Sequence, residues 1–282
     1  MNAVAADARP GPTTEQLVDA VVAARAEVAR SGPLVQCLTN SVVTTITANA
    51  LLAIGASPAM VDNPQEAAQF AAIASGVLVN VGTLDTEKAR AMDLAAASAQ
   101  QHGTPWVLDP VAVGTLEFRT TVARDLLAHR PAVVRANASE VLGLTGAGAG
   151  GRGTDATSTV EQAVEAARAL SLRTGGAVAV SGEVDVVVAG DRIVRVSGGT
   201  PLLTRTTGAG CALGALVAAY CAVTADPFVA AVAAHAHVAV AGERAADLAA
   251  GPGSFATAWI DALDAVGADV LASDLRSHAR LS

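Results

Sequence analysis

The sequence contains few cysteines and no excess of positive charge, and each shortage excludes a class of protein. Only three cysteines, Cys37, Cys211 and Cys221, occur in 282 residues, too scattered for a disulfide framework or a CxxC zinc site. The formal net charge of −8 gives no basic stripe, which argues against nucleic acid as the main partner. We therefore expect a cytoplasmic protein that binds a small molecule, with any anionic ligand held by local groups.

A leader peptide and a membrane span are also missing from the pattern. The opening stretch, MNAVAADARPGPTTEQ, has no basic segment followed by an apolar core, so we expect a short frayed tail over residues 1–13 and no signal peptide. Residues 206–225 carry no charge, but alanine and glycine dominate them rather than leucine and isoleucine. Glycines also open this segment, so it predicts a buried core helix and no association with a membrane.

The sequence is rich in apolar strand-like runs that alternate with helix-forming runs. The apolar runs are mostly continuous, which is typical of buried parallel strands. They cover residues 34–39, 76–82, 105–110, 132–137 and 177–182. Helix formers with apolar spacing lie at residues 44–54, 65–74, 87–101, 121–129, 139–144 and 160–172. This order predicts an α/β fold of three layers, with a mostly parallel central sheet and helices on both faces.

The last third of the chain changes character. Residues 184–198 form two β-rich runs around Gly190 and Asp191, which predicts a hairpin at the sheet edge. Three helices should follow, at residues 208–223, 228–248 and 255–271. The glycine-rich stretch 145–158 has neither a preceding strand nor a following GK[ST], so it predicts a flexible loop and no P-loop. No linker separates two cores, and we expect one domain over residues 1–282.

Polar residues stand where the predicted parallel strands end. Open parallel sheets bind ligands at the carboxyl ends of their strands, and these ends carry Asn40, Gly82, Asp109 and the stretches RANASE and SGE. Asp109 and Glu140 are two carboxylates that could converge near the glycine turn of residues 207–211. Mg²⁺ prefers one or two carboxylates, waters and the substrate's phosphates, so this set predicts a metal-bridged phosphate site. Alternatively, Glu140 only helps a helix to start behind an Asn or Ser N-cap.

The stretch TRTTGAGCALGAL, residues 204–216, changes from a glycine loop to a helix. A helix start offers unpaired N–H groups and the positive end of the macrodipole, so this loop predicts an anion site. Cys211 stands at that start. From the residues alone it could be a nucleophile with a lowered pKa, a general base, or a small apolar residue that packs well.

Seven stretches carry a further signal, in order within residues 33–223: TNSVVTTITANALLAIGASPAM, GTL, VLDPVAVG, FRT, VRANASE, SGEVD and LLTRTTGAGC. Together they resemble the hydroxyethylthiazole kinases, salvage enzymes of thiamine synthesis in the ribokinase-like superfamily. The TAN…GASPAM stretch joined to DPV and GAGC is the most specific part. The resemblance implies a ribokinase-like fold and transfer of the γ-phosphoryl group of ATP to the hydroxyl of 4-methyl-5-(2-hydroxyethyl)thiazole.

The resemblance also implies roles for individual residues. The thiazole pocket would be lined by Asn40, Val42, Met60 and Gly208. ATP would be contacted by Arg135 and Ser181, and Mg²⁺ would be organised by Asp109 and Glu140. Thr207, Gly208 and Gly210 would form the anion hole, with Cys211 as the base near the accepting hydroxyl. Ser181 stands where the family pattern has Thr, which keeps the hydroxyl. The family further implies a homotrimer with sites shared between neighbouring subunits.

Other classes of protein stay open at this stage. An enzyme with Cys211 as covalent nucleophile needs a histidine within hydrogen-bond reach, and we expect no histidine near a strand end. His235 and His237 are two apart on a predicted helix, so ordinary packing is expected of them. A protein that binds a nucleotide or thiazole without turnover would need no base. Among kinases, the alternative is hydroxymethylpyrimidine kinase or a related vitamin-precursor kinase. Arg119 could reach a phosphate or pair with a carboxylate, and Cys37 has no assigned role.

Overall fold

The computed structural model describes residues 13–147, 160–278 and 280–282, and the strands within them form one sheet. The strands are β1 (Leu34–Leu38), β2 (Ser57–Ala59), β3 (Gly76–Asn80), β4 (Trp106–Asp109), β5 (Val133–Asn137), β6 (Ala177–Ser181), β7 (Asp185–Ala189) and β8 (Arg192–Val196). Their order in the sheet is β2-β1-β3-β4-β5-β6-β7-β8. Neighbours from β2 to β6 are parallel, and the hairpin β7–β8 adds two antiparallel strands at one edge.

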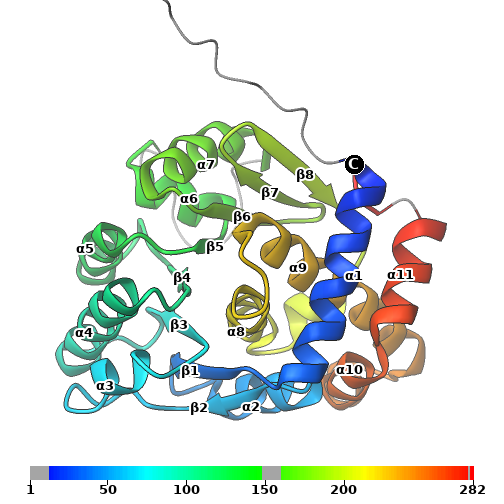
Figure 1. Ribbon diagram of the computed structural model, residues 1–282, viewed down its shortest axis with the longest axis horizontal. Helices are drawn as coiled ribbons and strands as arrows, with labels where there is room; N and C mark the ends of the chain where they lie inside the picture. Colours follow the sequence, from blue (N-terminus) through cyan, green and yellow to red (C-terminus); the bar gives the residue numbers. More distant parts are fainter. Residues whose placement is uncertain (1–12, 148–159, 279) are drawn as a thin grey trace, which may run out of the picture.

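Helices cover both faces of the sheet (Figure 1). One layer contains α3 (Ala67–Ala71), α4 (Thr86–His102), α5 (Glu117–Leu126), α6 (Ala138–Thr145) and α7 (Val160–Thr174). The other layer contains α1 (Thr14–Ser31), α2 (Thr44–Ala53), α8 (Ala209–Cys221), α9 (Pro227–Leu248), α10 (Pro252–Ala265) and α11 (Ala268–Ser277). In β3, Val77 and Val79 pack against the first layer and Leu78 against the second. Burial on both faces explains the continuous apolar runs, and the predicted three-layer fold is confirmed.

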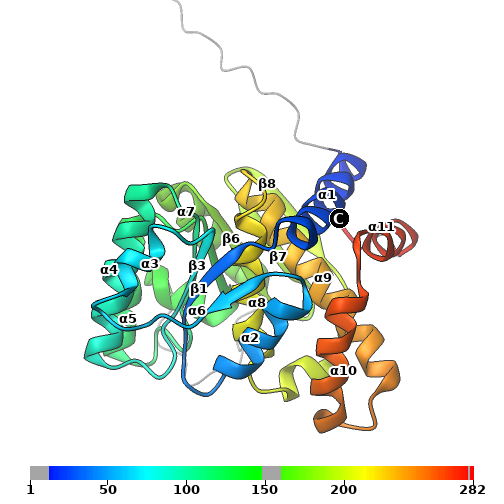
Figure 2. The same cartoon turned by 60° about the horizontal axis from the view of Figure 1, so that its bottom comes forward.

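The helix α8 brings the glycine loop to the carboxyl ends of the central strands. It packs on β3 and β4 and lies beside α9 and α2 (Figure 2). A carbon atom added at Gly76 would lie 2.5 Å from the carbonyl oxygen of Ala218, and one added at Gly214 would lie 3.0 Å from Leu78. Gly76 therefore has to be glycine for α8 to lie this close to the sheet, while a larger residue at position 214 would require the Leu78 side chain to shift. Within the described part of the chain, no helix is long and apolar enough to cross a membrane.

The two edges of the sheet differ in how they end. β2 is a three-residue strand paired only with β1. On the free side of β8, Val196 forms an isolated antiparallel bridge with Leu281, and the N–H of Arg195 donates to the carbonyl of Ser282 at 2.7 Å. The C-terminal residues thus cover part of the outer edge of β8.

Several predicted boundaries were wrong. The helix predicted over residues 255–271 is two helices, α10 and α11, because Val266 (φ −81°, ψ 76°) and the extended Gly267 interrupt it. The helix α1 and the short strand β2 were not predicted. Thr13, assigned to the frayed tail, is the N-cap of α1 and accepts a hydrogen bond from the N–H of Gln16. The other residues of that tail lie outside the described residues, as does most of the predicted loop 145–158.

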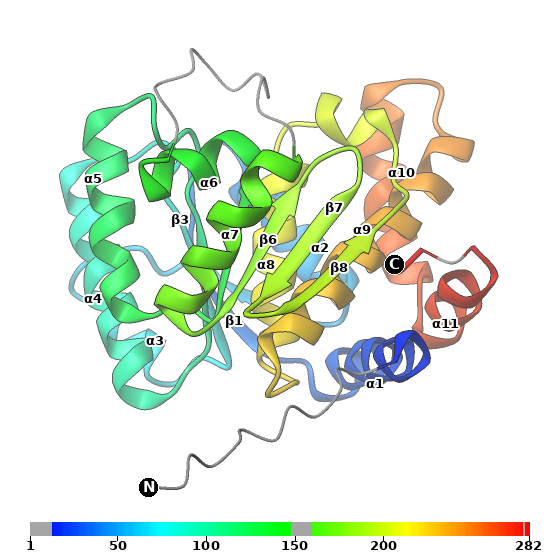
Figure 3. The same cartoon turned by 90° about the horizontal axis from the view of Figure 1, so that it is seen from above.

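The predicted edge hairpin is confirmed. β7 and β8 are joined by a two-residue turn at Gly190 and Asp191, and Gly190 takes the left-handed φ of 59° that such turns require. α7 packs on one face of β6 and β7, and α9 packs on the other (Figure 3).

Candidate active site

Buried polar side chains meet at the carboxyl ends of β1, β3 and β4. Asn40 follows β1, Asn80 ends β3 and Asp109 ends β4, and all three are buried. Asn80 Nδ2 donates to Asp109 Oδ2 at 2.8 Å, and Asn40 Nδ2 donates to Asn80 Oδ1 at 3.2 Å. Asn40 Nδ2 also lies 3.4 Å from the Sγ atom of Cys211, to which it donates. One chain of hydrogen bonds therefore joins Asp109 to Cys211.

Asp109 is the most strongly perturbed carboxylate of this group. Burial raises the pKa of Asp109 to about 7; Glu140 acts in the same direction, while Arg135 and Asn80 oppose it. Arg135 Nη1 lies 3.9 Å from Asp109 Oδ2. The Oδ1 atom of Asp109 is buried and has no hydrogen-bond partner. Because buried polar atoms are nearly always satisfied, Oδ1 is a candidate position for a cation or a proton.

Cys211 is the third residue of α8 and is half-buried. Burial raises the pKa of its thiol, and so does the charge of Asp109; Asn80, Arg135 and Asn40 only partly oppose them. The hypothesis that the helix start lowers the pKa of the Cys211 thiol is therefore wrong. The thiol accepts a hydrogen bond from an amide, which cannot take up its proton.

The start of α8 is a glycine turn that places an arginine beside the first residues of the helix. Gly208 is the N-cap, with a left-handed φ of 92°, and a carbon atom added to it would lie 2.5 Å from Ile46. A carbon atom added to Gly210 would lie 3.2 Å from Nη1 of Arg135, so the guanidinium rests against this helix start. Thr207 is exposed just before it. A helix start offers N–H groups to an anion, and an arginine beside it adds positive charge, so this arrangement favours phosphate binding.

The guanidinium of Arg135, in β5, is held by a side chain of the neighbouring strand β6. Its Nη2 donates to Ser181 Oγ at 2.9 Å, and its Nε is buried without a hydrogen-bond partner. The structure thus brings together Arg135 and Ser181, the two residues that the resemblance assigns to ATP.

Glu140 has a different environment from Asp109. Its Oε2 accepts from the N–H of Asn137 at 2.8 Å and its Oε1 from the N–H of Ala112 at 2.9 Å, while Asn137 Oδ1 accepts from the N–H of Glu140. This is a capping box at the start of α6, so the helix-start role left open for Glu140 is confirmed. In the described residues, no three His, Cys, Asp or Glu side chains cluster closely enough to hold a metal. A metal-organising role of Glu140 stays a prediction.

The residues expected to line the thiazole pocket are not all buried together. Asn40 belongs to the buried chain, whereas Val42 is 67% exposed and Met60 is 36% exposed. Arg119 Nη1 donates to the carbonyl of Val111 at 3.1 Å, so its partner among the described residues is a backbone oxygen. Cys37 is buried in the core.

Three residues of this region were not predicted. Asn80 was readable as a lone amide in the apolar run GVLVNVG, at the end of a strand. Asp185 ends the quoted stretch SGEVD, but its pairing with His235 was not readable, because 50 positions separate the two residues; His235 Nδ1 and Asp185 Oδ2 are 2.6 Å apart. The expectation that no histidine lies near a strand end was therefore wrong, because α9 carries His235 to the start of β7. His237 packs as expected, between Tyr220 and the carbonyl of Leu263.

A mostly parallel sheet with an antiparallel edge hairpin, and a glycine helix start beside a buried carboxylate and an arginine, define the ribokinase-like fold, and the relatives described below make the protein a small-molecule kinase. A pyridoxal kinase from Bacillus subtilis, solved as an ADP complex, shares this fold, with a TM-score of 0.56 and 21% identity, over 75% of this chain and 92% of that one.

Comparisons of sequence define the family more narrowly. The chain matches the hydroxyethylthiazole kinase family over residues 26–269. A hydroxyethylthiazole kinase from Kineococcus radiotolerans is 69% identical over 282 residues, the whole of both chains. The structure of the hydroxyethylthiazole kinase protein from Pyrococcus horikoshii has a TM-score of 0.84 and 36% identity, covering 93% of this chain and 98% of that one. The chain belongs to the hydroxyethylthiazole kinase family, and the resemblance seen in the sequence is confirmed.

Proposed function

We propose that this kinase transfers the γ-phosphoryl group of ATP to the hydroxyl of 4-methyl-5-(2-hydroxyethyl)thiazole, as a salvage step toward thiamine. The observation that carries the proposal is the hydrogen-bond chain from Asp109 to Cys211 beside the start of α8. It offers an acceptor-side thiol and a phosphate-side carboxylate within one connected group. Family membership supplies the substrate class.

On the acceptor side, Asn40, Val42, Met60 and Gly208 line the thiazole pocket in this proposal. Methionine and aliphatic side chains with one amide suit a small sulfur heterocycle. Only the thiolate form of Cys211 can accept the proton of the attacking hydroxyl, which converts it to the thiol. Because the pKa of Cys211 is raised, this form is scarce at neutral pH and the base contributes little; proton transfer follows most of the bond change in a loose transition state.

On the nucleotide side, Arg135 and Ser181 contact ATP, with Thr207 at the mouth of the anion hole. The N–H groups at Gly208 and Gly210 face the charge that develops on the transferred phosphoryl group. Arg135 adds a fixed positive charge beside them, held by Ser181. Positioning and electrostatic stabilisation are the main requirements of phosphoryl transfer, and these groups supply both.

The residues fit a magnesium ion held mainly by one carboxylate. Asp109 Oδ1 is buried and lacks a partner, which suits a hard cation, directly or through water. Both oxygens of Glu140 already accept N–H groups, so Glu140 contributes charge near the metal more than a free ligand. When bound, Mg²⁺ neutralises the charge of the β- and γ-phosphates. The protein's own part is to hold Asp109 in place through Asn80.

The kinase works, in this proposal, as a single domain in a cytoplasmic homotrimer. Val42, Met60 and Leu52 are apolar, exposed and close in sequence to the acceptor side, so a neighbouring subunit would cover them and complete the thiazole pocket. Light scattering tests the trimer, and a monomer with full activity would overturn the shared site.

The central test is an assay of ADP release with ATP, Mg²⁺ and one alcohol at a time. We expect turnover with the thiazole alcohol and at least about a hundredfold lower kcat/KM with hydroxymethylpyrimidine. Faster turnover of the pyrimidine would identify the alternative vitamin-precursor kinase. Binding of the thiazole with no ADP release would identify a binding protein.

A further inference from the structure

Two side-chain contacts, each involving a carboxylate, join the edge hairpin to α9, one at each end of the hairpin. At the carboxyl end of β6, Asp185 of β7 pairs with His235 of α9. At the opposite end, both Nη atoms of Arg192 in β8 donate to the carboxylate of Asp226, the N-cap of α9. Figure 3 shows the hairpin lying along α9. The first tie lies at the end of the sheet that carries the active site.

Asp185 closes the turn that follows Ser181. Its Oδ1 accepts from the N–H of Gly182 at 2.9 Å, and its Oδ2 accepts from His235 Nδ1 at 2.6 Å. The side chain of His235 is fully buried, so its position is fixed by packing in α9. Both oxygens of Asp185 are thus used to fasten one short turn to a rigid helix.

This turn is continuous with the nucleotide side of the active site. Ser181 is the residue directly before Gly182, and Ser181 Oγ accepts from Arg135 Nη2 at 2.9 Å. Arg135 in turn lies against Gly210 at the start of α8. Burial alone would raise the pKa of Asp185, but His235, the Gly182 N–H and Arg135 together lower it, so the carboxylate is ionised when it makes these contacts.

We propose that Asp185 and His235 are positioning residues for the nucleotide: they hold the turn after β6 so that Ser181 keeps the Arg135 guanidinium at the phosphate-binding start of α8. The inference rests on the proposed nucleotide role of Arg135 and Ser181. Neither Asp185 nor His235 touches ATP in this account. Their effect reaches the nucleotide only through the position of Ser181 and Arg135.

The Arg192–Asp226 tie provides a matched control. It joins the same hairpin to the same helix, and it also involves a carboxylate that caps backbone N–H groups. It lies at the amino end of β6, away from Arg135. Loss of either tie should lower the stability of the hairpin, but only loss of the Asp185–His235 tie should weaken nucleotide binding.

The test is equilibrium dialysis of the full chain with Mg²⁺ and ATP, combined with thermal unfolding. We expect Asp185→Ala and His235→Leu to raise the Kd for ATP about tenfold. His235→Asn keeps an N–H at the position of Nδ1, and it should bring the Kd back to within about threefold of the unchanged protein. Asp226→Ala should lower the melting temperature and leave the Kd within about twofold.

The outcomes separate this inference from the proposed function. A folded Asp185→Ala or His235→Leu variant with normal ATP affinity overturns the inference, as does an equal loss of affinity in Asp226→Ala. If Asp185→Ala does not fold, the Kd values for ATP of His235→Leu and His235→Asn are compared instead: equal values overturn the inference, and tighter binding by His235→Asn supports it. Dialysis needs no turnover, so an unchanged protein that binds ATP but does not phosphorylate the thiazole defeats the proposed function alone. An unchanged protein that does not bind ATP defeats both.

Discussion

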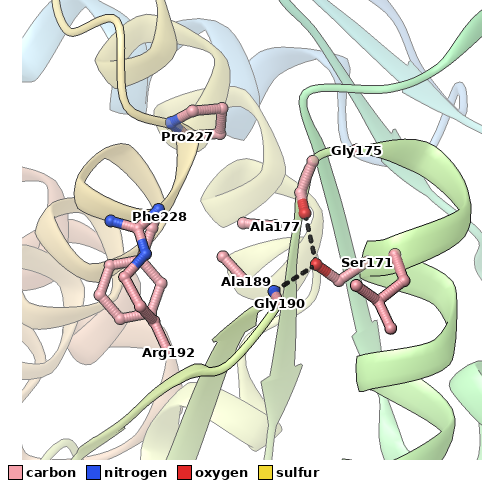
Figure 4. Close-up of a pocket in the computed structure, with 10 residues that line it drawn as sticks. Ser171, Gly175, Ala177, Ala189, Gly190, Arg192, Pro227 and Phe228 are labelled. Atoms are coloured by element: carbon pink, nitrogen blue, oxygen red, sulfur yellow. Dashed lines mark hydrogen bonds between the residues drawn. The ribbon is translucent and has the colours of Figure 1, made fainter. Parts of the chain in front are cut away.

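The two ends of the central sheet both carry charged side chains, but they satisfy their polar atoms very differently. At the carboxyl end, Asp109 Oδ1 and Arg135 Nε are buried and lack partners. At the amino end of β6 lies a cavity of about 290 Å³ (Figure 4). There Ser171 Oγ donates to the carbonyl of Gly176 at 2.7 Å and accepts from the N–H of Gly190 at 2.9 Å.

The charged group at the amino end is satisfied as well. Arg192 makes two hydrogen bonds to Asp226, and its guanidinium stacks over the ring of Phe228 at 4.5 Å. A ligand would have to break existing bonds to gain new ones there. The comparison teaches that a cavity alone does not indicate a site; charged side chains with buried, unpartnered atoms beside a helix start are the better indication, because a ligand can supply the missing partners.

Of the substitutions that test this difference between the two ends of the sheet, one at Asp109 should change kcat the most. Asp109→Asn should lower kcat at least about a hundredfold, because it removes the only unpartnered carboxylate oxygen of the site. It should also raise the free energy of unfolding at pH 8 by about 1–3 kcal/mol, because the buried charge is removed. Denaturant unfolding and ADP release measure the two effects. A variant that is less stable than the unchanged protein at pH 8 would contradict the electrostatic account.

The pH dependence of that stability difference has a definite sign. The folded pKa of Asp109, about 7, lies above its ordinary value of 3.8, so the folded state holds a proton that the unfolded state has released. The stability contributed by this carboxyl is complete below 3.8 and is lost as the pH rises through 7. The stability gain of Asp109→Asn should therefore grow across this range and level off above it. A gain that is the same at pH 4 and pH 8 would rule the shift out.

Asn80 should give the next largest effect. Asn80→Ala removes the donor to Asp109 and the acceptor for Asn40, so kcat should fall about tenfold to a hundredfold, with the KM for ATP changed less than about twofold. If the residues act as one chain, the effects of Asn80→Ala and Asn40→Ala on kcat should not add. Additive effects in the double variant would show that the two amides act independently.

A smaller effect is expected at Cys211. Because its thiol has a raised pKa, Cys211→Ala should slow turnover only about tenfold. Cys211→Asp supplies an ionised base and should keep or raise kcat, provided that the charge fits beside the transferred phosphoryl group and Asp109. A covalent nucleophile predicts instead that both folded variants are inactive. Measurement of kcat at neutral pH for both variants distinguishes the two roles.

The smallest effect on activity is expected at the opposite end of the sheet. Ser171→Ala leaves the Gly190 N–H and the Gly176 carbonyl without this partner, so it should lower the free energy of unfolding by about 1–2 kcal/mol. Both kcat and KM should remain unchanged within error, as ADP release would show. A clear change in kcat or KM would show that the amino end of the sheet also has a functional role, and the proposed difference between the two ends would be wrong.

The sequence predicted the layers of the fold because burial on both faces makes parallel strands continuously apolar. It missed α1, although Thr13 and Gln16 form a readable capping box, and it missed β2, which is too short to carry a pattern. Asp109 was found as a polar residue at a strand end. Its bond to Asn80 depends on the register of β3 and β4, which places Asn80 opposite Asp109 and which no local pattern states.

The roles of Glu140 and His235 show the limits of reading local sequence. The stretch RANASE was compatible with a capping box and with a metal ligand, and the N–H groups of Asn137 and Ala112 show the cap, while the metal role stays a prediction. His235 looked like a core residue, and its carboxylate partner became visible only when α9 was packed against β7. Contacts between distant segments are set by tertiary packing, so sequence periodicity does not carry them.

The bridge between Val196 and Leu281 has a consequence for the behaviour of the protein in concentrated solution. An open strand edge recruits strands of other molecules, and aggregation starts from such edges. In this chain the last residues occupy part of the free side of β8, and Arg280 anchors them through Glu243 at 3.0 Å. Deleting these residues, or fusing an expression tag that pulls them away, would leave the free side of β8 uncovered and open to pairing with strands of other molecules.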